Sequence, residues 1–135
     1  MRYLGIDPGG KRIGLAIGND VTATATALEV VPYGGVAEAV RRIVQMAEEQ
    51  GAGTLVLGLP LDVDGKETAA CARSHKLRAA LEALGWRVEL QAEYLTSNEA
   101  RRRAREAGLP RRAPIDHLAA QVLLEEFLGG HRCGD

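Results

Sequence analysis

Apolar and polar residues alternate with a period of two in the first part of the chain, which is typical of β-strands. Three such segments follow one another, over residues 2–7, 12–18 and 21–31. The first runs into the proline- and glycine-rich residues 7–10, and the second ends at Asn19-Asp20, and both are turn sequences. The pattern therefore predicts three consecutive strands that pair antiparallel.

The apolar period then changes to that of a helix. Apolar residues recur at helical spacing from Val36 to Ala47, and Gly51 and Gly53 end this segment. The short apolar run over residues 54–58 is typical of a central strand that is covered on both faces.

Helical and strand patterns alternate through the rest of the chain. Thr96 and Glu99 form a capping box, in which each side chain can bond the backbone amide of the other residue at the start of a helix. The expected elements are a loop over residues 59–65, a helix from about 67 to 84, a strand over 87–91, a helix from 97 to 108 and a last helix from 115 to 128.

This order of elements predicts an α/β protein with a mixed five-stranded sheet and helices on both faces. The 135 residues are near the common size of one domain, so we expect a single domain over residues 1–135. Functional sites in such sheets form where the carboxyl ends of neighbouring strands open a crevice.

Composition excludes several classes of protein. With 46% hydrophobic and 26% charged residues, the chain is typical of an ordinary globular domain rather than a disordered or fibrous one. No apolar run approaches the roughly 20 residues of a membrane helix, and the N-terminus has no apolar signal core. Cys71 and Cys133 are too few for a disulfide framework or a zinc site. We therefore expect a cytoplasmic protein with no membrane association.

Three acidic residues fall at predicted element ends. Asp7 ends the first strand, Glu93 lies just beyond the fifth, and Asp116 is in the first turn of the last helix. Clustered carboxylates repel one another unless a cation joins them, and oxygen ligands suit Mg²⁺ or Mn²⁺. Two such ions roughly 4 Å apart would activate a water and stabilise the leaving oxygen in phosphodiester cleavage.

Each of these acids also has a plainer interpretation. Asp7 could simply begin a turn, and Asp116 could be favoured by the dipole of the last helix. Glu93 on its own is more typical of a solvated strand end than of a ligand. Only their joint placement favours a shared site.

Basic residues gather in two places although the net charge is −1. Lys11 and Arg12 follow the first turn and could meet phosphate oxygens there. The segment 101–112 holds only one acidic residue but six arginines, namely Arg101, Arg102, Arg103, Arg105, Arg111 and Arg112. Crowded arginines repel one another on a helix, and a phosphate backbone would relieve that repulsion, although a solvated helix face is the alternative.

Four motifs in order resemble the YqgF (RuvX) family of Holliday-junction-resolvase-like proteins, which have the ribonuclease H-like fold. The resemblance covers Tyr3 to Leu128. The matching segments are Gly5-Ile6-Asp7 with Lys11-Arg12-Ile13-Gly14 and Asn19-Asp20, Gly58-Leu59-Pro60 with Asp64-Gly65, Glu93 with Leu95-Thr96 and Glu99-Ala100, and Ile115-Asp116 with Leu118-Ala119-Ala120.

The resemblance implies nuclease acids at Asp7, Glu93 and Asp116, a divalent metal, and a structured nucleic-acid substrate. Members of the family are described as junction resolvases and as nucleases in maturation of the small-subunit ribosomal RNA precursor. The family usually has Asp-Glu-Arg where this chain has Ala92-Glu93-Tyr94. One flanking acid and one phosphate-binding cation are therefore absent, which affects efficiency more than metal binding.

Three functions remain open from the sequence. The first is a metal-dependent endonuclease that acts on pre-16S rRNA or on Holliday junctions, as a homodimer if it resolves a symmetric junction. The second is a noncatalytic nucleic-acid-binding factor on a nuclease fold, which the altered flanks of Glu93 favour slightly. The third is an ATP-dependent phosphotransferase, because acid-glycine-lysine hairpins also occur in actin-like ATPases, although those proteins use two such domains.

Overall fold

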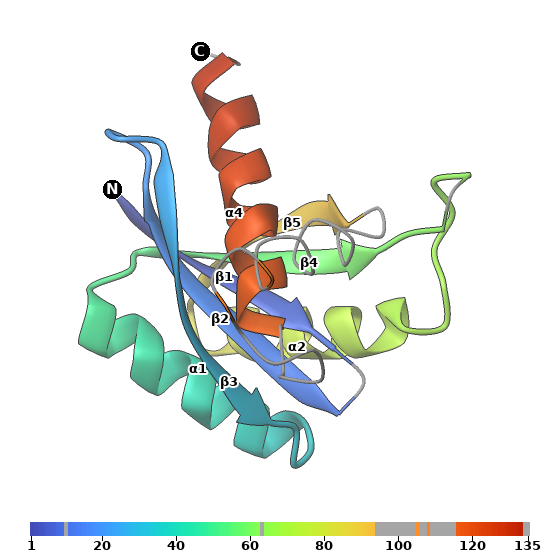
Figure 1. The fold of residues 1–135 in the computed structure, drawn as a ribbon. Helices are drawn as coiled ribbons and strands as arrows, with labels where there is room; N and C mark the ends of the chain where they lie inside the picture. Colours follow the sequence, from blue (N-terminus) through green and yellow to red (C-terminus); the bar gives the residue numbers. More distant parts are fainter. Residues whose placement is uncertain (10, 63, 94–104, 106–107, 109–115, 134–135) are drawn as a thin grey trace.

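The computed structural model describes residues 1–9, 11–62, 64–93, 105, 108 and 116–133. A five-stranded sheet forms the middle layer, and helices lie on both of its faces (Figure 1). The mixed α/β architecture that the hydrophobic pattern predicts is thus confirmed. In this part of the chain, no helix is both long enough and apolar enough to cross a membrane.

The sheet has the strand order β3-β2-β1-β4-β5. The first three strands are antiparallel neighbours, while β4 runs parallel to both β1 and β5. The strands are β1 (Arg2–Pro8), β2 (Arg12–Asn19), β3 (Thr24–Pro32), β4 (Thr54–Pro60) and β5 (Arg87–Glu93). Because β1, β4 and β5 point the same way, their carboxyl ends meet at one edge of the sheet.

Helices α1 (Val36–Gln50) and α2 (Cys71–Ala83) cover one face of the sheet, and α4 (Asp116–Cys133) crosses the other (Figure 1). The last helix extends five residues beyond its expected end at residue 128. The helix expected over residues 97–108, with its capping box, lies outside the described residues.

The larger core lies between the sheet and the pair α1 and α2. Leu4 and Ile6 of β1 meet Ile43 of α1 and Leu77 of α2, and all four side chains are fully buried. Burial of each such side chain stabilises the fold by roughly 1.5–3 kcal/mol. The apolar positions of both helices face this core. The hydrophobic pattern of the sequence therefore accounts for how the two helices pack on the sheet.

A smaller core lies under α4. Leu124 and Leu128 pack on Tyr3 and Val56 of the sheet, and the ring centroids of Tyr3 and Phe127 lie 5.4 Å apart. The sheet carries several glycines on this face, which lets the helix approach closely.

The closest approach of α4 to the sheet is at Gly14 of β2. A Cβ at this position would lie 1.9 Å from the backbone oxygen of Asp116 and 2.5 Å from the backbone nitrogen of His117. Only a residue without a side chain leaves room for the start of α4.

Several element boundaries differ from the sequence prediction, and the first and fourth strands end at Pro8 and Pro60, each later than expected. The third strand begins at Thr24 rather than at residue 21, because residues 20–23 form a turn. The side chain of Val21 is 82% exposed, and Ala23 has a φ of 54°. The alternation of apolar and polar residues from Val21 to Ala23 therefore does not mark a paired strand.

The second helix begins at Cys71 rather than near Glu67. Glu67 instead pairs with Leu61 in an isolated bridge, and the Thr68 hydroxyl donates to the Pro60 carbonyl over 2.8 Å. These contacts hold Glu67 and Thr68 in the loop after β4, so the helix begins later in the chain. At the far end, β5 includes Glu93 as its last residue, where the sequence placed Glu93 just beyond the strand.

Replacing Gly14 with alanine tests the close approach of α4. We expect Gly14→Ala to lower the free energy of unfolding by about 3 kcal/mol or more, because the added methyl group meets backbone atoms that cannot rotate away. Urea unfolding followed by circular dichroism measures the change. In Gly34→Ala the nearest atom is the flexible Glu38 Cγ at 3.4 Å, so this control should stay within about 0.5 kcal/mol of the parent. Equal midpoints for the two variants would show that α4 does not depend on Gly14.

Candidate functional site

Asp7 lies at the carboxyl end of β1 and is only 8% exposed. Its partner across the hairpin is Gly14, where α4 begins to cover the sheet. Residues paired across antiparallel strands direct their side chains to the same face. The Asp7 carboxyl group therefore lies under the start of α4, on the face opposite α1 and α2.

Glu93 reaches Asp7 across an intervening strand. It is the last residue of β5, and β4 separates β5 from β1. A Cβ on Gly58 of β4 would lie 2.8 Å from Glu93 Oε2, so the Glu93 side chain lies directly over this glycine. Because Gly58 has no side chain, the carboxylate of Glu93 comes within hydrogen-bonding distance of the Asp7 carboxyl group.

The pKa of Asp7 is raised well above its usual value. Burial is the main cause, followed by the charge of Glu93, the hydrogen bond with Glu93 and the charge of Asp116. A buried acid beside two other acids favours its neutral form, because two adjacent negative charges repel one another in a medium of low polarity. Without a cation, the neutral form of Asp7 is therefore favoured over a wider pH range than in an exposed aspartate.

Asp116 is the first residue of α4, and its charge acts on Asp7. The Arg12 Nε donates to Asp116 Oδ2 over 3.2 Å, with the two side chains 50% and 20% exposed. A Cβ on Gly9 would lie 2.5 Å from Asp116 Oδ1, so the hairpin turn also depends on a residue without a side chain. An ion pair this exposed contributes little stability, and it can open at low cost.

The three predicted acids thus come together at one edge of the sheet, from β1, β5 and α4. Among the described residues, no group of three acidic, histidine or cysteine side chains is arranged to hold a metal ion. Instead, a hydrogen bond joins Asp7 to Glu93, and Arg12 forms an ion pair with Asp116. The donor set nevertheless fits a hard divalent ion, because carboxylate oxygens are its preferred ligands and its charge would replace the proton and the arginine.

The predicted basic residues are only partly described. Lys11 and Arg105 are exposed, while Arg12 is engaged with Asp116. The remaining members of the arginine segment, Arg101, Arg102, Arg103, Arg111 and Arg112, lie outside the described residues.

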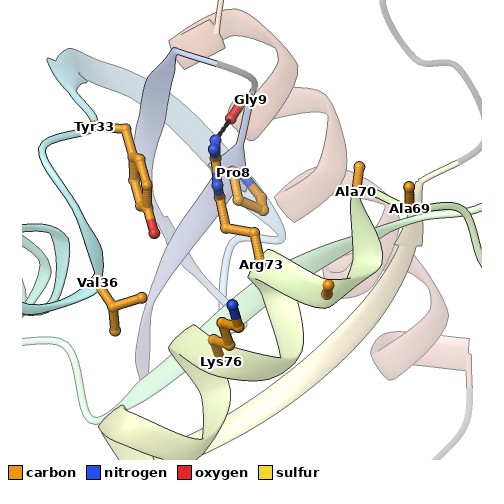
Figure 2. A pocket seen from close by; sticks show the side chains of 9 residues that line it. Pro8, Gly9, Tyr33, Val36, Ala69, Ala70, Arg73 and Lys76 are labelled. Atoms are coloured by element: carbon orange, nitrogen blue, oxygen red, sulfur yellow. Dashed lines mark hydrogen bonds between the residues drawn. The ribbon is translucent and has the colours of Figure 1, made fainter.

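One contributor, Arg73, was not singled out by the sequence. The Arg73 guanidinium on α2 donates to the Gly9 carbonyl, and its Cζ lies 3.9 Å from the centre of the Tyr33 ring (Figure 2). Arg73 therefore fixes the turn that follows Asp7. No signal in the sequence distinguishes this arginine from an ordinary solvated helix residue, because the contact joins segments 64 positions apart.

His117 follows Asp116 in the first turn of α4. It is partly buried, and its Nδ1 is buried without a hydrogen-bond partner among the described residues. Burial lowers the pKa of His117, and the charge of Asp116 opposes this shift. The ring is therefore mainly neutral at pH 7, beside the acidic cluster.

Helix α2 holds the end of β4 in place beneath Glu93. Ser74 is fully buried, and its hydroxyl donates to the Gly58 carbonyl over 2.8 Å. The Cys71 thiol donates to the Pro60 carbonyl over 3.1 Å. The pairing of β4 with β1 ends at Leu57, and these contacts give hydrogen-bond donors to the carbonyl groups of Gly58 and Pro60 beyond it.

Comparison with known proteins gives a consistent result. Residues 1–130 match the RuvX family, which is described as Holliday junction resolvase. A protein of Anaeromyxobacter sp. (strain Fw109-5) is 40% identical over 96% of this chain and 98% of its own length. A protein of Thermus thermophilus is 37% identical over 95% of this chain and 97% of its own length. Both carry the name "Putative pre-16S rRNA nuclease".

Solved structures show the same fold at low sequence identity. Thermus thermophilus RuvC superposes with a TM-score of 0.61 at 18% identity, covering 97% of this chain and 96% of RuvC. The Fowlpox virus resolvase, solved with Holliday junction DNA, superposes with a TM-score of 0.55 at 8% identity, covering 97% and 99% of the two chains. The predicted ribonuclease H-like fold is therefore confirmed.

The raised pKa of Asp7 predicts how stability changes with pH in metal-free buffer. The folded chain holds the Asp7 proton more tightly than the unfolded chain, so stability falls as pH rises from the ordinary range of aspartate through the raised pKa. Asp7→Asn removes this loss, and its amide can still donate to Glu93. We expect Asp7→Asn to melt several degrees higher than the parent at pH 8, where about 4 °C corresponds to 1 kcal/mol.

Calorimetry with a chelator between pH 4 and pH 8 measures this difference, which should shrink towards pH 4. Asp64 is exposed on the loop after β4, so Asp64→Asn serves as the matched control and should not change the pH profile. A lower melting temperature for Asp7→Asn at pH 8 would contradict the prediction.

Proposed function

Because the chain belongs to the RuvX family, we propose that it is a metal-dependent endonuclease with Asp7, Glu93 and Asp116 as its catalytic acids. The nuclease class follows from the family and from the RuvC-like fold. The observation that carries the choice of residues is the hydrogen bond between the buried Asp7 and Glu93, with Asp116 close enough to raise the pKa of Asp7. Strongly perturbed pKa values cluster at functional sites, which favours a functional role for this contact.

Asp7, Glu93 and Asp116 would hold Mg²⁺ or Mn²⁺. Such an ion supplies an activated water and stabilises the leaving oxygen of a phosphodiester. Asp7 would lose its proton when the ion binds, and Arg12 would leave Asp116 to contact a phosphate oxygen. The neutral His117 imidazole beside Asp116 can accept a hydrogen bond from a water at the edge of the site.

Charge rather than base recognition would hold the substrate. Lys11 and Arg12 lie on the hairpin beside the acids, and both are exposed. We also assign phosphate contacts to the segment that contains Arg101, Arg102, Arg105, Arg111 and Arg112, on the basis of its charge alone. Such contacts position the backbone without selecting a sequence.

Structured RNA, in particular the 16S rRNA precursor, is the substrate that we favour. The relatives that carry this name are 40% and 37% identical, whereas RuvC is 18% identical. We further propose that residues 1–135 act as one nuclease domain in the cytoplasm. If the protein instead resolved Holliday junctions, a two-fold symmetric homodimer would be required to cut both strands.

A cleavage assay tests this proposal directly. We expect the purified protein to cut a labelled 16S rRNA precursor when Mn²⁺ or Mg²⁺ is present, and Glu93→Gln to reduce the rate by roughly 100-fold or more. The loss of even an indirect contact to a metal ion typically costs 10–100-fold. Denaturing gel electrophoresis measures the products, and a four-way DNA junction is run in parallel.

Binding of the same RNA to Glu93→Gln should remain, and Asp64→Asn should cut at the parental rate. Equal cleavage by Glu93→Gln and the parent would reject Glu93 as a catalytic acid. No cleavage by the parent with either metal, together with salt-sensitive RNA binding, would favour the noncatalytic factor.

Gly58 offers a test of how Glu93 is positioned. Gly58→Ala places a methyl group 2.8 Å from Glu93 Oε2 and should turn this flexible side chain away from Asp7. We expect cleavage to fall about tenfold or more while the melting temperature stays within a few degrees, because only a side-chain end must move. Gly53→Ala, where nothing lies within 4 Å of the new Cβ, should leave both unchanged. Cleavage by Gly58→Ala at the parental rate would contradict this role.

A further inference from the structure

A pocket of about 510 Å³ opens on the opposite side of the hairpin turn from the three acids. It lies between the end of β1, the segment that leads from β3 into α1, and the first turns of α2 (Figure 2). The lining residues are Pro8, Gly9, Tyr33, Val36, Ala69, Ala70, Ala72, Arg73 and Lys76. A pocket of this size can hold one nucleotide-sized ligand.

The lining combines an apolar surface with positive charge. Val36, Pro8 and the alanines supply the apolar part, while Arg73 and Lys76 supply two cations. No acidic side chain is among the described residues that line the pocket. This chemistry matches a ligand that has a flat, weakly polar body and a negative group, as a nucleotide does.

The two cations differ in how they are held. Arg73 is fixed between the Gly9 carbonyl and the Tyr33 ring, so its charge is already in place (Figure 2). Lys76 lies three residues further along the same face of α2, is exposed, and forms no ion pair with any residue that the structure describes. Lys76 is therefore available to a phosphate group.

The pocket and the acids share the turn after Asp7. The Asp7 carboxyl group lies on the α4 side, whereas the Gly9 carbonyl bonds Arg73 on the pocket side. Gly9 is two residues beyond Asp7, and its amide donates to the Asp7 carbonyl over 3.0 Å, so the turn between the two sides is tight. A strand with one phosphate at the acids can therefore cross the turn and place a neighbouring nucleotide in the pocket.

We propose that this pocket seats one unpaired nucleotide of the substrate strand, beside the bond that is cut. Its phosphate contacts Lys76 and Arg73, and its base lies against Val36 and the alanines at the start of α2. This assignment rests on the proposed nuclease function, but its test measures binding alone. The chemistry is shared by RNA and DNA, and the probes below separate the two.

Removal of the Lys76 charge is the first test. Fluorescence anisotropy would follow a ten-nucleotide oligouridine RNA, and a deoxyuridine DNA of equal length, on the Asp7→Asn variant in chelator. We expect Lys76→Ala to lower the slope of log affinity against log salt by about 0.7, the value for one phosphate contact on a single strand. Arg87→Ala removes one charge at the opposite end of β5 and should leave the slope unchanged.

Filling the pocket without a change of charge is the second test. We expect Ala70→Leu to weaken oligonucleotide binding about fivefold or more at an unchanged salt slope, because the base loses its place. Ala79 is exposed on the same helix and does not line the pocket, so Ala79→Leu is the matched control and should bind normally. Circular dichroism melting verifies that all variants fold.

The outcomes separate this proposal from the proposed function. Normal binding by Ala70→Leu overturns the pocket assignment, even where Lys76→Ala binds weakly, because only a surface charge would then be involved. Parental cleavage by Glu93→Gln rejects the assigned acids and leaves these binding results valid. Weaker binding of RNA alone, or of both probes, supports the pocket and also tells which strand it accepts.

Discussion

The contact between Asp7 and Glu93 is the constraint on which the site depends. Two acids from strands that are not neighbours share one buried space above β4, and the missing side chain of Gly58 is what lets them meet. Like charges in such a place cost free energy unless a proton or a cation lies between them. The rigid end of β4, held by Ser74 and Cys71 from α2, keeps this costly geometry in place.

The third acid reaches the site through backbone packing and not through side-chain attraction. Gly14 lets the start of α4 approach the sheet, and this approach sets where Asp116 lies. The apolar contacts of Leu124 and Leu128 further along α4 supply the stabilisation that holds the helix on the sheet. Helix α4 therefore contributes both to the site and to the core. Its first turn carries Asp116, and its later turns carry the apolar residues that pack on the sheet.

The order of elements and the mixed sheet could be predicted because apolar periodicity reports burial, and both helices α1 and α2 bury the stripes that the sequence displays. Proximity of the three acids could be expected from their places at element ends. The role of Gly58 beside Glu93 could not be predicted, and neither could the contact of Arg73 with Gly9. Each depends on a partner far along the chain. The late start of α2 was missed for a similar reason, since the Pro60 carbonyl competes for the residues that would begin the helix.

The net charge of −1 conceals a division at the hairpin turn. Acids lie on one side of the Pro8-Gly9 turn, and Arg73 and Lys76 lie on the other. A nucleic acid is repelled by bare carboxylates, so it can approach the acidic side only where a cation neutralises them. The basic side needs no such help, because no acidic side chain is among the described residues that line the pocket there. A nucleic-acid strand held first by the basic side would bring its phosphates to the turn, and a cation bound there would lower the repulsion between those phosphates and the acids.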